Sequence, residues 1–247
     1  MTARIAHIWR HPIKSHGREA LDRVRVTEGT SLPWDRTWAV THEASKTDGT
    51  GWAPCVNFSR GSKAPSLMAI AARLDEAAES VTLTHPDRPD LTFRPDNDAA
   101  AFLDWVAPLM PADRAASAGL VRIEGRGMTD TDFPSISLAG LGSLRALSGK
   151  VGRPVDPRRF RINFWVEGLA PWEEFEWIGR EIAIGGARFR VEARIERCLA
   201  TTANPDTGRR DTDTLGALED GWGHRDLGVY LVATGSGEVA IGDPVSA

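Results

Sequence analysis

Short stretches of alternating apolar and polar residues, separated by Gly and Pro, run along most of the chain. Such stretches predict strands, and their close spacing is typical of a barrel or a sandwich rather than of βαβ units. The pair Gly185-Gly186 lies between two of them and predicts a hairpin turn. The predicted strands cover 5–9, 23–26, 37–41, 67–74, 81–84, 91–93, 160–166, 181–184, 189–196, 229–232 and 239–241, with a further strand beginning at 121.

Two segments have helical spacing instead. Asp96 is a predicted N-cap, and the apolar residues of 102–106 form one side of a helix that Pro108 stops. Leucines at every third position over 141–147 predict a short amphipathic helix that ends at Gly149. The pattern as a whole predicts a mainly β protein with a few helices, of the α+β class.

Composition narrows the classes of protein. The chain has 247 residues, with 30 Lys and Arg against 34 Asp and Glu, and a net charge of −4. This balance gives no electrostatic case for binding nucleic acid. No run of 18 apolar residues occurs, and the N-terminus has the pattern of a strand rather than of a signal peptide. We therefore expect a soluble, cytoplasmic protein without membrane contact.

Cys198 is the most informative single residue. The chain has two cysteines, too few for a disulfide framework or a four-cysteine zinc site. Cys198 follows the alternating stretch 189–196 and shares the polar face with Arg190 and Glu196. A thiol at the end of a strand, next to Arg197, suits a reactive or metal-ligating thiolate. The alternative from the residues alone is a small buried apolar side chain.

Three basic groups are candidate anion sites. Lys14 and Ser15 follow the first predicted strand, Asp35 and Arg36 precede the third, and the run 158–163 holds three arginines and one asparagine. Lysine binds phosphate as a point charge and arginine grips an anion with two hydrogen bonds. For Lys14 and for the run 158–163 the alternative is a solvated basic side chain, and for Arg36 it is a structural role.

Several familiar catalytic motifs are absent from the sequence. It contains no GxxxxGK or GxGxxG loop, no HExxH and no GxSxG. A nucleophilic triad that uses Cys198 and His224 stays open, although no spacing supports it.

Taken together, these groups resemble the MOSC family, proteins related to the C-terminal domain of molybdenum cofactor sulfurase. The resemblance is strongest to the branch that contains the mitochondrial amidoxime reducing component and its bacterial relatives, and it spans nearly the whole chain. The matching segments are Pro12-Ile-Lys-Ser15, Asp35-Arg36, Phe160-Arg-Ile-Asn163, Arg197-Cys198, Thr201-Thr-Ala-Asn-Pro-Asp-Thr-Gly208 and Val239-Ala-Ile-Gly-Asp-Pro-Val245.

The resemblance implies a fold and a division of the chain. It implies a MOSC-type β-barrel domain over 111–247, preceded by an N-terminal MOSC β-barrel module over 1–110. The residue pattern itself predicts a linker over 111–117.

The resemblance also implies a molybdenum cofactor, a metal held by a pyranopterin dithiolene. Cys198 would be the protein ligand of molybdenum, which agrees with the preference of soft thiolates for such a centre. An acidic residue is expected near the metal, and Asp132 is preferred over Asp130. The residues implied to bind the rest of the cofactor are Lys14, Ser15, Arg36, Arg161, Asn163 and Arg197.

Two hypotheses for the function follow. The first is an oxidoreductase that reduces N-hydroxylated small molecules, with Cys198 bound to molybdenum throughout. Because the sequence contains no further cysteines for an electron-transfer domain, this hypothesis expects a separate electron-donor protein. The segment 57–60 departs from the amidoxime-reducing pattern, which leaves the substrate open. The second hypothesis is a carrier of the cofactor or of sulfur, without turnover of its own.

Overall fold

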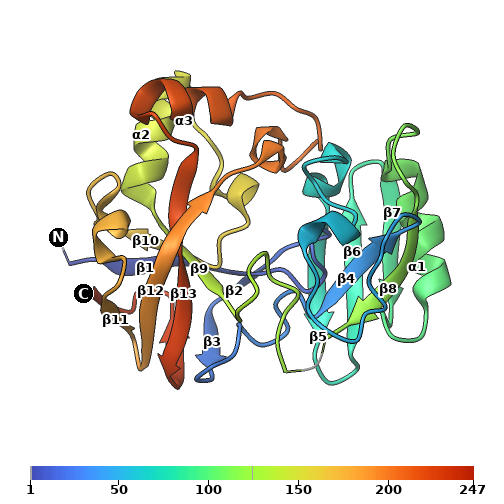
Figure 1. The fold of residues 1–247 in the computed structure, drawn as a ribbon, viewed down its shortest axis with the longest axis horizontal. Coiled ribbons are helices and arrows are strands. Elements are labelled where there is room, and N and C mark those ends of the chain that lie inside the picture. The colour runs from blue at the N-terminus through green and yellow to red at the C-terminus, as the bar shows by residue number, and fades with distance from the viewer. Residues whose placement is uncertain (1, 124) are drawn as a thin grey trace.

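The computed structural model describes residues 2–123 and 125–247, and they form two lobes that lie side by side (Figure 1). The larger lobe is built on an eight-stranded sheet in the order β15-β11-β12-β13-β9-β10-β1-β2. All neighbours in this sheet are antiparallel except β9 and β10. Its strands are β1 (Arg4–Arg10), β2 (Glu19–Leu21), β9 (Ile136–Gly140), β10 (Phe164–Glu167), β11 (Glu181–Ile184), β12 (Ala187–Glu196), β13 (Asp226–Gly235) and β15 (Val245–Ser246).

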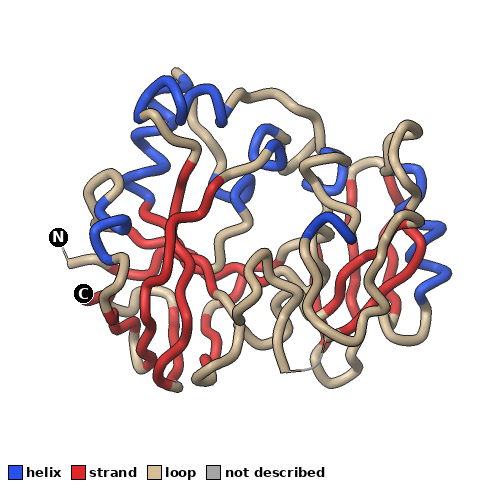
Figure 2. The backbone as a smooth tube through the Cα atoms, viewed as in Figure 1, coloured by secondary structure: helices blue, strands red, loops and turns tan. Residues whose placement is uncertain are grey.

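One face of this sheet and a two-stranded ribbon enclose the main apolar core. The ribbon pairs β3 (Arg23–Val26) with β14 (Gly237–Ala240). Phe164, Phe189 and Leu231 are fully buried in this core. In β3 and β11 the alternation that predicted the strand reflects one face turned toward this core and one toward solvent. The prediction of a mainly β protein with a few helices is confirmed, as Figure 2 shows.

The smaller lobe has two small sheets and one helix around a second core. In this core Trp38 and Phe102 are completely buried. Its elements are β4 (Trp38–His42) paired with β8 (Ser117–Arg122), the three-stranded sheet of β5 (Ala71–Asp75), β6 (Ser80–His85) and β7 (Arg88–Phe93), and α1 (Ala99–Val106).

Two helices, α2 (Leu141–Val151) and α3 (Thr214–Trp222), pack against each other beside the larger sheet (Figure 1). Leu147 and Leu218 belong to the core that they close. None of the helices in the described ranges is long and apolar enough to cross a bilayer. Short 3-10 helices complete the fold: η1 (Cys55–Asn57), η2 (Pro65–Ala69), η3 (Ala107–Leu109), η4 (Pro157–Phe160), η5 (Glu173–Trp177) and η6 (Leu199–Thr202).

The two lobes are interleaved along the chain. β1 pairs with β10 and β3 pairs with β14, so the first strands lie in the larger lobe. β8 pairs with β4 in the smaller lobe. Each lobe in space therefore draws on both of the ranges, 1–110 and 111–247, into which the sequence divides the chain.

Several predicted elements are corrected by the structure. Residues 65–69 form η2 rather than the start of a strand, because Pro65 stands in its first turn and lacks the N–H that a strand ladder needs. The helix predicted to end at Gly149 continues to Val151, and Gly152 ends it in the left-handed region at φ 81°.

The strand predicted over 160–166 begins only at Phe164, because Arg161 adopts a left-handed conformation with φ 52°. The N-cap position of α1 is Asp98 and not Asp96. Asp96 instead accepts hydrogen bonds from the Trp38 indole and the Arg122 guanidinium. Its predicted capping role is therefore wrong.

Backbone carbonyls and two arginines join the lobes next to the loop that follows β12. The Arg18 guanidinium donates to the carbonyl of Met68 at 2.7 Å and to that of Pro205 at 2.8 Å. The Arg210 guanidinium donates to the carbonyl of Ser62 at 2.8 Å. The segment after β12 is thus held against the smaller lobe at the place where Figure 1 shows the orange and teal segments meeting.

We expect the protein to lose stability steeply in mild acid. His11 and His16 are fully buried, and burial is the main cause that lowers the pKa of His11 to about 3 and of His16 to about 4. Below pH 6.5 the unfolded chain binds protons at these histidines while the folded chain does not, so stability falls as the pH drops toward 4. The two groups together give a slope of up to about 3 kcal/mol per pH unit.

Urea unfolding between pH 7 and pH 5 measures this slope. His16→Gln keeps a donor for the carbonyl of Lys14, which the imidazole Nδ1 contacts at 2.7 Å, and removes the titration. In this variant, stability should depend less steeply on pH, by up to the part of the slope that one titrating histidine contributes. An unchanged slope in His16→Gln would contradict the assignment.

Candidate functional site

A cavity of about 270 Å³ opens where the two lobes meet, and residues from both lobes line it. Most of the predicted site residues meet there although the sequence separates them widely. Those that line the cavity are Lys14, Ser15, Arg36, Arg161, Arg197 and Cys198.

Cys198 lies just beyond the end of β12 and at the N-cap position of η6. Its side chain is exposed and lines the cavity. The backbone N–H and the hydroxyl of Thr201 both donate to the carbonyl of Cys198 at 3.1 Å. Thr201 in turn contacts the hydroxyl of Thr214 in α3 at 2.6 Å. The turn that presents the thiol is therefore held rigidly from within the larger lobe.

The glycine that ends the segment Thr201-Thr-Ala-Asn-Pro-Asp-Thr-Gly208 fixes this loop against the other lobe. Gly208 has φ 67°, and a Cβ there would lie 2.6 Å from the Cα of Ser66. Only glycine fits both the left-handed conformation and the close approach. The position of the Cys198 loop thus depends on docking to the segment that contains η2.

Lys14 and Asp130 form an ion pair at the cavity. The buried Lys14 ammonium donates to the carbonyl of Met128 at 2.9 Å and to the carboxylate of Asp130. The side chain of Asp130 is 58% exposed, which leaves its carboxylate accessible to a bound molecule. The enclosed surroundings act to raise the pKa of Asp130, but the charges of Lys14 and Arg36 outweigh this effect and lower the pKa to about 2. Asp130 is therefore ionised at neutral pH.

Arg36 is held in place by the aspartate that precedes it. Asp35 is completely buried, accepts hydrogen bonds from the backbone N–H of His11 at 2.8 Å and pairs with Arg36. Burial acts to raise the pKa of Asp35, but the charge of Arg36 and the hydrogen bonds from His11 hold it well below its usual value. The Arg36 guanidinium also donates to the carbonyl of Arg161 at 3.1 Å. Asp35 is thus a positioning residue for Arg36.

Arg161 is a cation without a carboxylate partner among the described residues. Its guanidinium donates to the carbonyl of Gly17 at 3.0 Å. Burial and the neighbouring charge of Arg36 lower the pKa of Arg161 to about 9. Burial and the charge of Arg36 make the Arg161 charge unfavourable, so an anion that binds in the cavity stabilises the charged guanidinium.

Arg197 is also a cation without a carboxylate partner among the described residues. Its guanidinium lies 5.4 Å from the centre of the Phe160 ring and donates to the Phe160 carbonyl. Burial lowers its pKa. In the part of the chain that the structure describes, its buried Nε has no hydrogen-bond partner. An orphaned donor beside Cys198 indicates a place for an acceptor from a ligand.

Three of the predicted cofactor residues have a left-handed backbone. Ser15, Arg36 and Arg161 have φ values of 63°, 55° and 52°. For residues with a Cβ this conformation costs roughly 1–2 kcal/mol each. Such outliers gather at functional sites, where the surrounding structure holds them in place. All three of these side chains line the same cavity.

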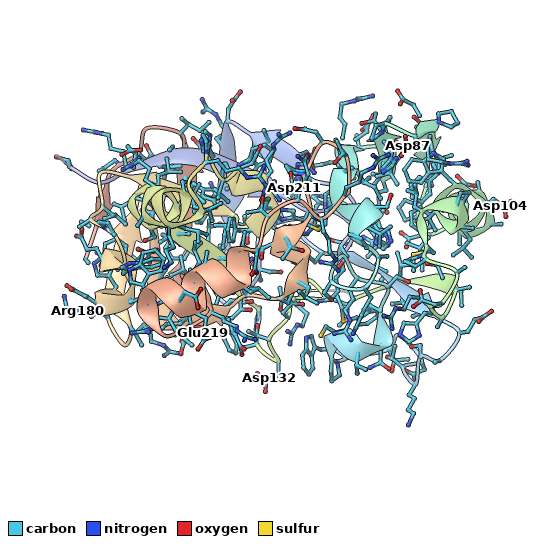
Figure 3. The ribbon with its side chains drawn as sticks, turned by 90° about the horizontal axis from the view of Figure 1, so that it is seen from above. Asp87, Asp104, Asp132, Arg180, Asp211 and Glu219 are labelled. Atoms are coloured by element: carbon cyan, nitrogen blue, oxygen red, sulfur yellow. The ribbon has the colours of Figure 1, made fainter. Side chains whose placement is uncertain are left out.

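The structure places two of the predicted residues elsewhere. Asn163 is buried outside the main cavity and lines a side pocket of about 20 Å³. Its amide nitrogen donates to the carbonyl of Trp9, and its amide oxygen accepts from Ser137. Asp132 is exposed and projects from the edge of the molecule (Figure 3). Of the two acidic candidates, Asp130 lines the cavity and Asp132 does not.

Further cavity residues were not predicted from the sequence. Tyr230, the only tyrosine of the chain, lines the cavity from β13. Burial and the charge of Asp130 raise the pKa of Tyr230 to about 12, so its hydroxyl stays protonated. Cys55 and Arg60 line the cavity from the smaller lobe. Tyr230 lies within a strand, and Cys55 and Arg60 are isolated residues outside any motif, so no pattern in the sequence could have identified them.

The acidic and sulfur-bearing residues around Cys198 do not form a ready metal site. Within the described ranges, no group of three or more His, Cys, Asp or Glu side chains could hold a metal ion. A metal at Cys198 would therefore need most of its ligands from a bound cofactor, which agrees with a protein that supplies one thiolate.

The chain matches two known family models. Residues 2–117 match the MOSC N-terminal beta barrel domain, and residues 131–246 match the MOSC domain. Together the two matches cover most of the chain, which belongs to the MOSC family.

Individual relatives are distant. The chain is 30% identical to mitochondrial amidoxime-reducing component 1 of Mus musculus over 115 residues, 42% of this chain and 33% of that protein. It is 36% identical to molybdenum cofactor sulfurase of Anopheles gambiae over 78 residues, 31% of this chain and 10% of that protein. It thus spans a third or less of either relative. The crystal structure of the YuaD protein from Bacillus subtilis aligns with 99% of this chain and 94% of that one, with a TM-score of 0.48 and 14% identity.

Proposed function

We propose that this protein binds a molybdenum–pterin cofactor through Cys198 and reduces N-hydroxylated small molecules. One observation carries the proposal: the exposed thiol of Cys198 lies in a cavity whose walls present several cations. Among them are Arg161 and Arg197, which have no carboxylate partner among the described residues. The similarity to the amidoxime-reducing component supports the choice of substrate.

The residues present fit such a cofactor. A thiolate is the soft ligand that suits molybdenum. Lys14 and Arg36 can bind a phosphate and oxygen-rich ring system through charge-assisted hydrogen bonds. The partnerless Nε of Arg197 supplies a donor that an acceptor on the cofactor would satisfy. We therefore assign Cys198 to the metal and the cations to the pterin and its phosphate.

Bound there, the cofactor would supply the two-electron chemistry for reducing an N–O group. The protein's own residues bind and orient. Asp130, ionised at neutral pH, accepts hydrogen bonds and keeps Lys14 in position. Tyr230 keeps its proton and is a neutral donor in the cavity wall, so we assign to it the hydrogen bond to the substrate oxygen.

A carrier of the cofactor or of sulfur is the second candidate, and the exposure of Cys198 favours it too, because a carrier must present its thiol to a partner. Both functions require the same cavity. They differ in whether the loaded protein turns over substrate.

Metal and pterin analysis of the purified protein, followed by an assay with a reduced dye and benzamidoxime, separates the two. The dye replaces the separate electron-donor protein that we propose. About one molybdenum per chain with dye oxidation that depends on benzamidoxime is the expected result. Bound cofactor without turnover of any N-hydroxylated compound would leave the carrier function, and a protein without cofactor affinity would contradict both.

A further inference from the structure

One wall of the cavity has no part in the proposed cofactor binding. It comes from the smaller lobe, where Cys55, Arg60 and Met68 line the cavity. The loop of Cys198 meets this wall, because a Cβ on Gly61 would lie 3.5 Å from the Cβ of Ala200. A molecule bound at Cys198 therefore faces this wall.

Arg60 is the charged residue of this wall. Its side chain is half-buried. The guanidinium donates to the Cys55 sulfur at 3.0 Å, and the side chain makes no other hydrogen bond to the described residues. Sulfur is a weak acceptor and leaves most of the five guanidinium donors free. Arg60 forms no ion pair within the described ranges, in contrast to Lys14 and Arg36. A partly desolvated cation without a counterion is a binding group for an anion.

The cations that we assign to the cofactor form a separate, connected cluster. Lys14 bonds to Asp130, and Arg36 bonds to the carbonyl of Arg161. The cationic charges that act most strongly on Asp130 belong to Lys14, Arg36 and Arg197. Among the described residues, the Arg60 guanidinium bonds only to Cys55, on its own wall. Its charge is therefore available to whatever lies beside the cofactor.

We propose that Arg60 selects substrates that carry a carboxylate in addition to the N–O group. This inference rests on the proposed function, because it places the N–O group at the metal. The guanidinium binds the carboxylate with two hydrogen bonds, and Cys55 holds the guanidinium in position. The proposal thus gives the substrate two anchor points, one at the metal and one at Arg60.

The experiment compares benzamidoxime with 4-carboxybenzamidoxime on the molybdenum-loaded protein, by turnover with a reduced dye and by calorimetric binding. The variants are Arg60→Met, which removes the charge, and Arg60→Lys, which keeps it. Lys63→Met is the matched control, because Lys63 is an exposed cation three residues away that does not line the cavity.

The wild type should prefer the carboxylated compound by about tenfold or more in kcat/KM, since hydrogen bonds to charged groups are the stronger class. Arg60→Met should lose this preference through a higher KM, Arg60→Lys should keep part of it, and Lys63→Met should keep all of it. Equal use of both compounds by the wild type would overturn the proposal. Loss of molybdenum from Arg60→Met would overturn it too, because it would assign Arg60 to the cofactor.

The two proposals fail in different ways. If the loaded wild type turns over neither compound but binds the carboxylated one more tightly, and Arg60→Met loses that difference, the proposed reduction is wrong and the selection by Arg60 stands. If both compounds are turned over and Arg60→Met changes nothing, the reduction stands and the role of Arg60 is wrong.

Discussion

Cys198→Ser is expected to fold like the wild type, to purify with at most about a tenth of its molybdenum and to show no measurable reduction of benzamidoxime. Loss of an outer partner of a metal ligand already costs roughly 10–100-fold in affinity, and loss of the ligand itself costs at least as much. A serine hydroxyl is a hard oxygen donor that replaces the soft thiolate poorly. Cys198 is exposed, so we expect the substitution to change packing little.

Cys55→Ser is the matched control, because it makes the same substitution in the same cavity on the wall of the smaller lobe. It should keep its molybdenum. Metal analysis of both variants and their thermal unfolding give the result directly. Full molybdenum content and turnover in Cys198→Ser would show that Cys198 is not the ligand.

Strands such as β3 and β11 were predictable because they have one buried and one solvent-facing side, so their alternation is visible in the sequence. β9 was not predicted, and all five of its residues are buried, so burial does not alternate along it. β11 was predicted at its observed bounds, and its hairpin with β12 follows from Gly185-Gly186. In β12 the alternation breaks at Ala193, which is exposed because the register shifts between Val191 and Ala193. A bulge depends on the partner strand, which a local pattern does not contain.

The third helix was not predicted. α3 contains Gly216 and Gly221, which lower helix propensity and hide the periodicity. The Asp213 carboxylate caps it locally by accepting from the N–H of Gly216 at 2.9 Å. The contact distant in sequence is its packing on α2, with Leu218 buried. Tertiary packing outweighs local propensity here.

For the site, family resemblance identified residues that composition and spacing could not. Cys198 and the cations of the cavity are brought together by strands from both lobes, and this convergence is a property of the topology. The choice between Asp130 and Asp132 depended on the path of one loop. Only the structure shows that Asp130 pairs with Lys14 while Asp132 faces solvent.

Arg161→Gln is expected to weaken cofactor retention by about 10- to 150-fold without a comparable loss of stability in the cofactor-free protein. One hydrogen bond between charged groups contributes about 1.5–3 kcal/mol, which corresponds to this range in affinity. In the cofactor-free protein the Arg161 charge has no carboxylate partner within the described ranges, and burial lowers its pKa to about 9. Removing that charge therefore also removes a desolvation cost, and the glutamine amide can still donate to the carbonyl of Gly17.

Arg158→Gln is the control for the prediction on Arg161. Arg158 belongs to the same run of arginines, pairs with Asp156 and Asp206, and does not line the cavity. It should retain the cofactor like the wild type. Molybdenum and pterin content after extended dialysis, together with urea unfolding of the cofactor-free proteins, separates the two effects. If Arg161→Gln keeps its cofactor, or if it loses the cofactor only together with several kcal/mol of stability, Arg161 is a structural residue. A selective loss of retention follows only if the guanidinium binds an anion in the cavity.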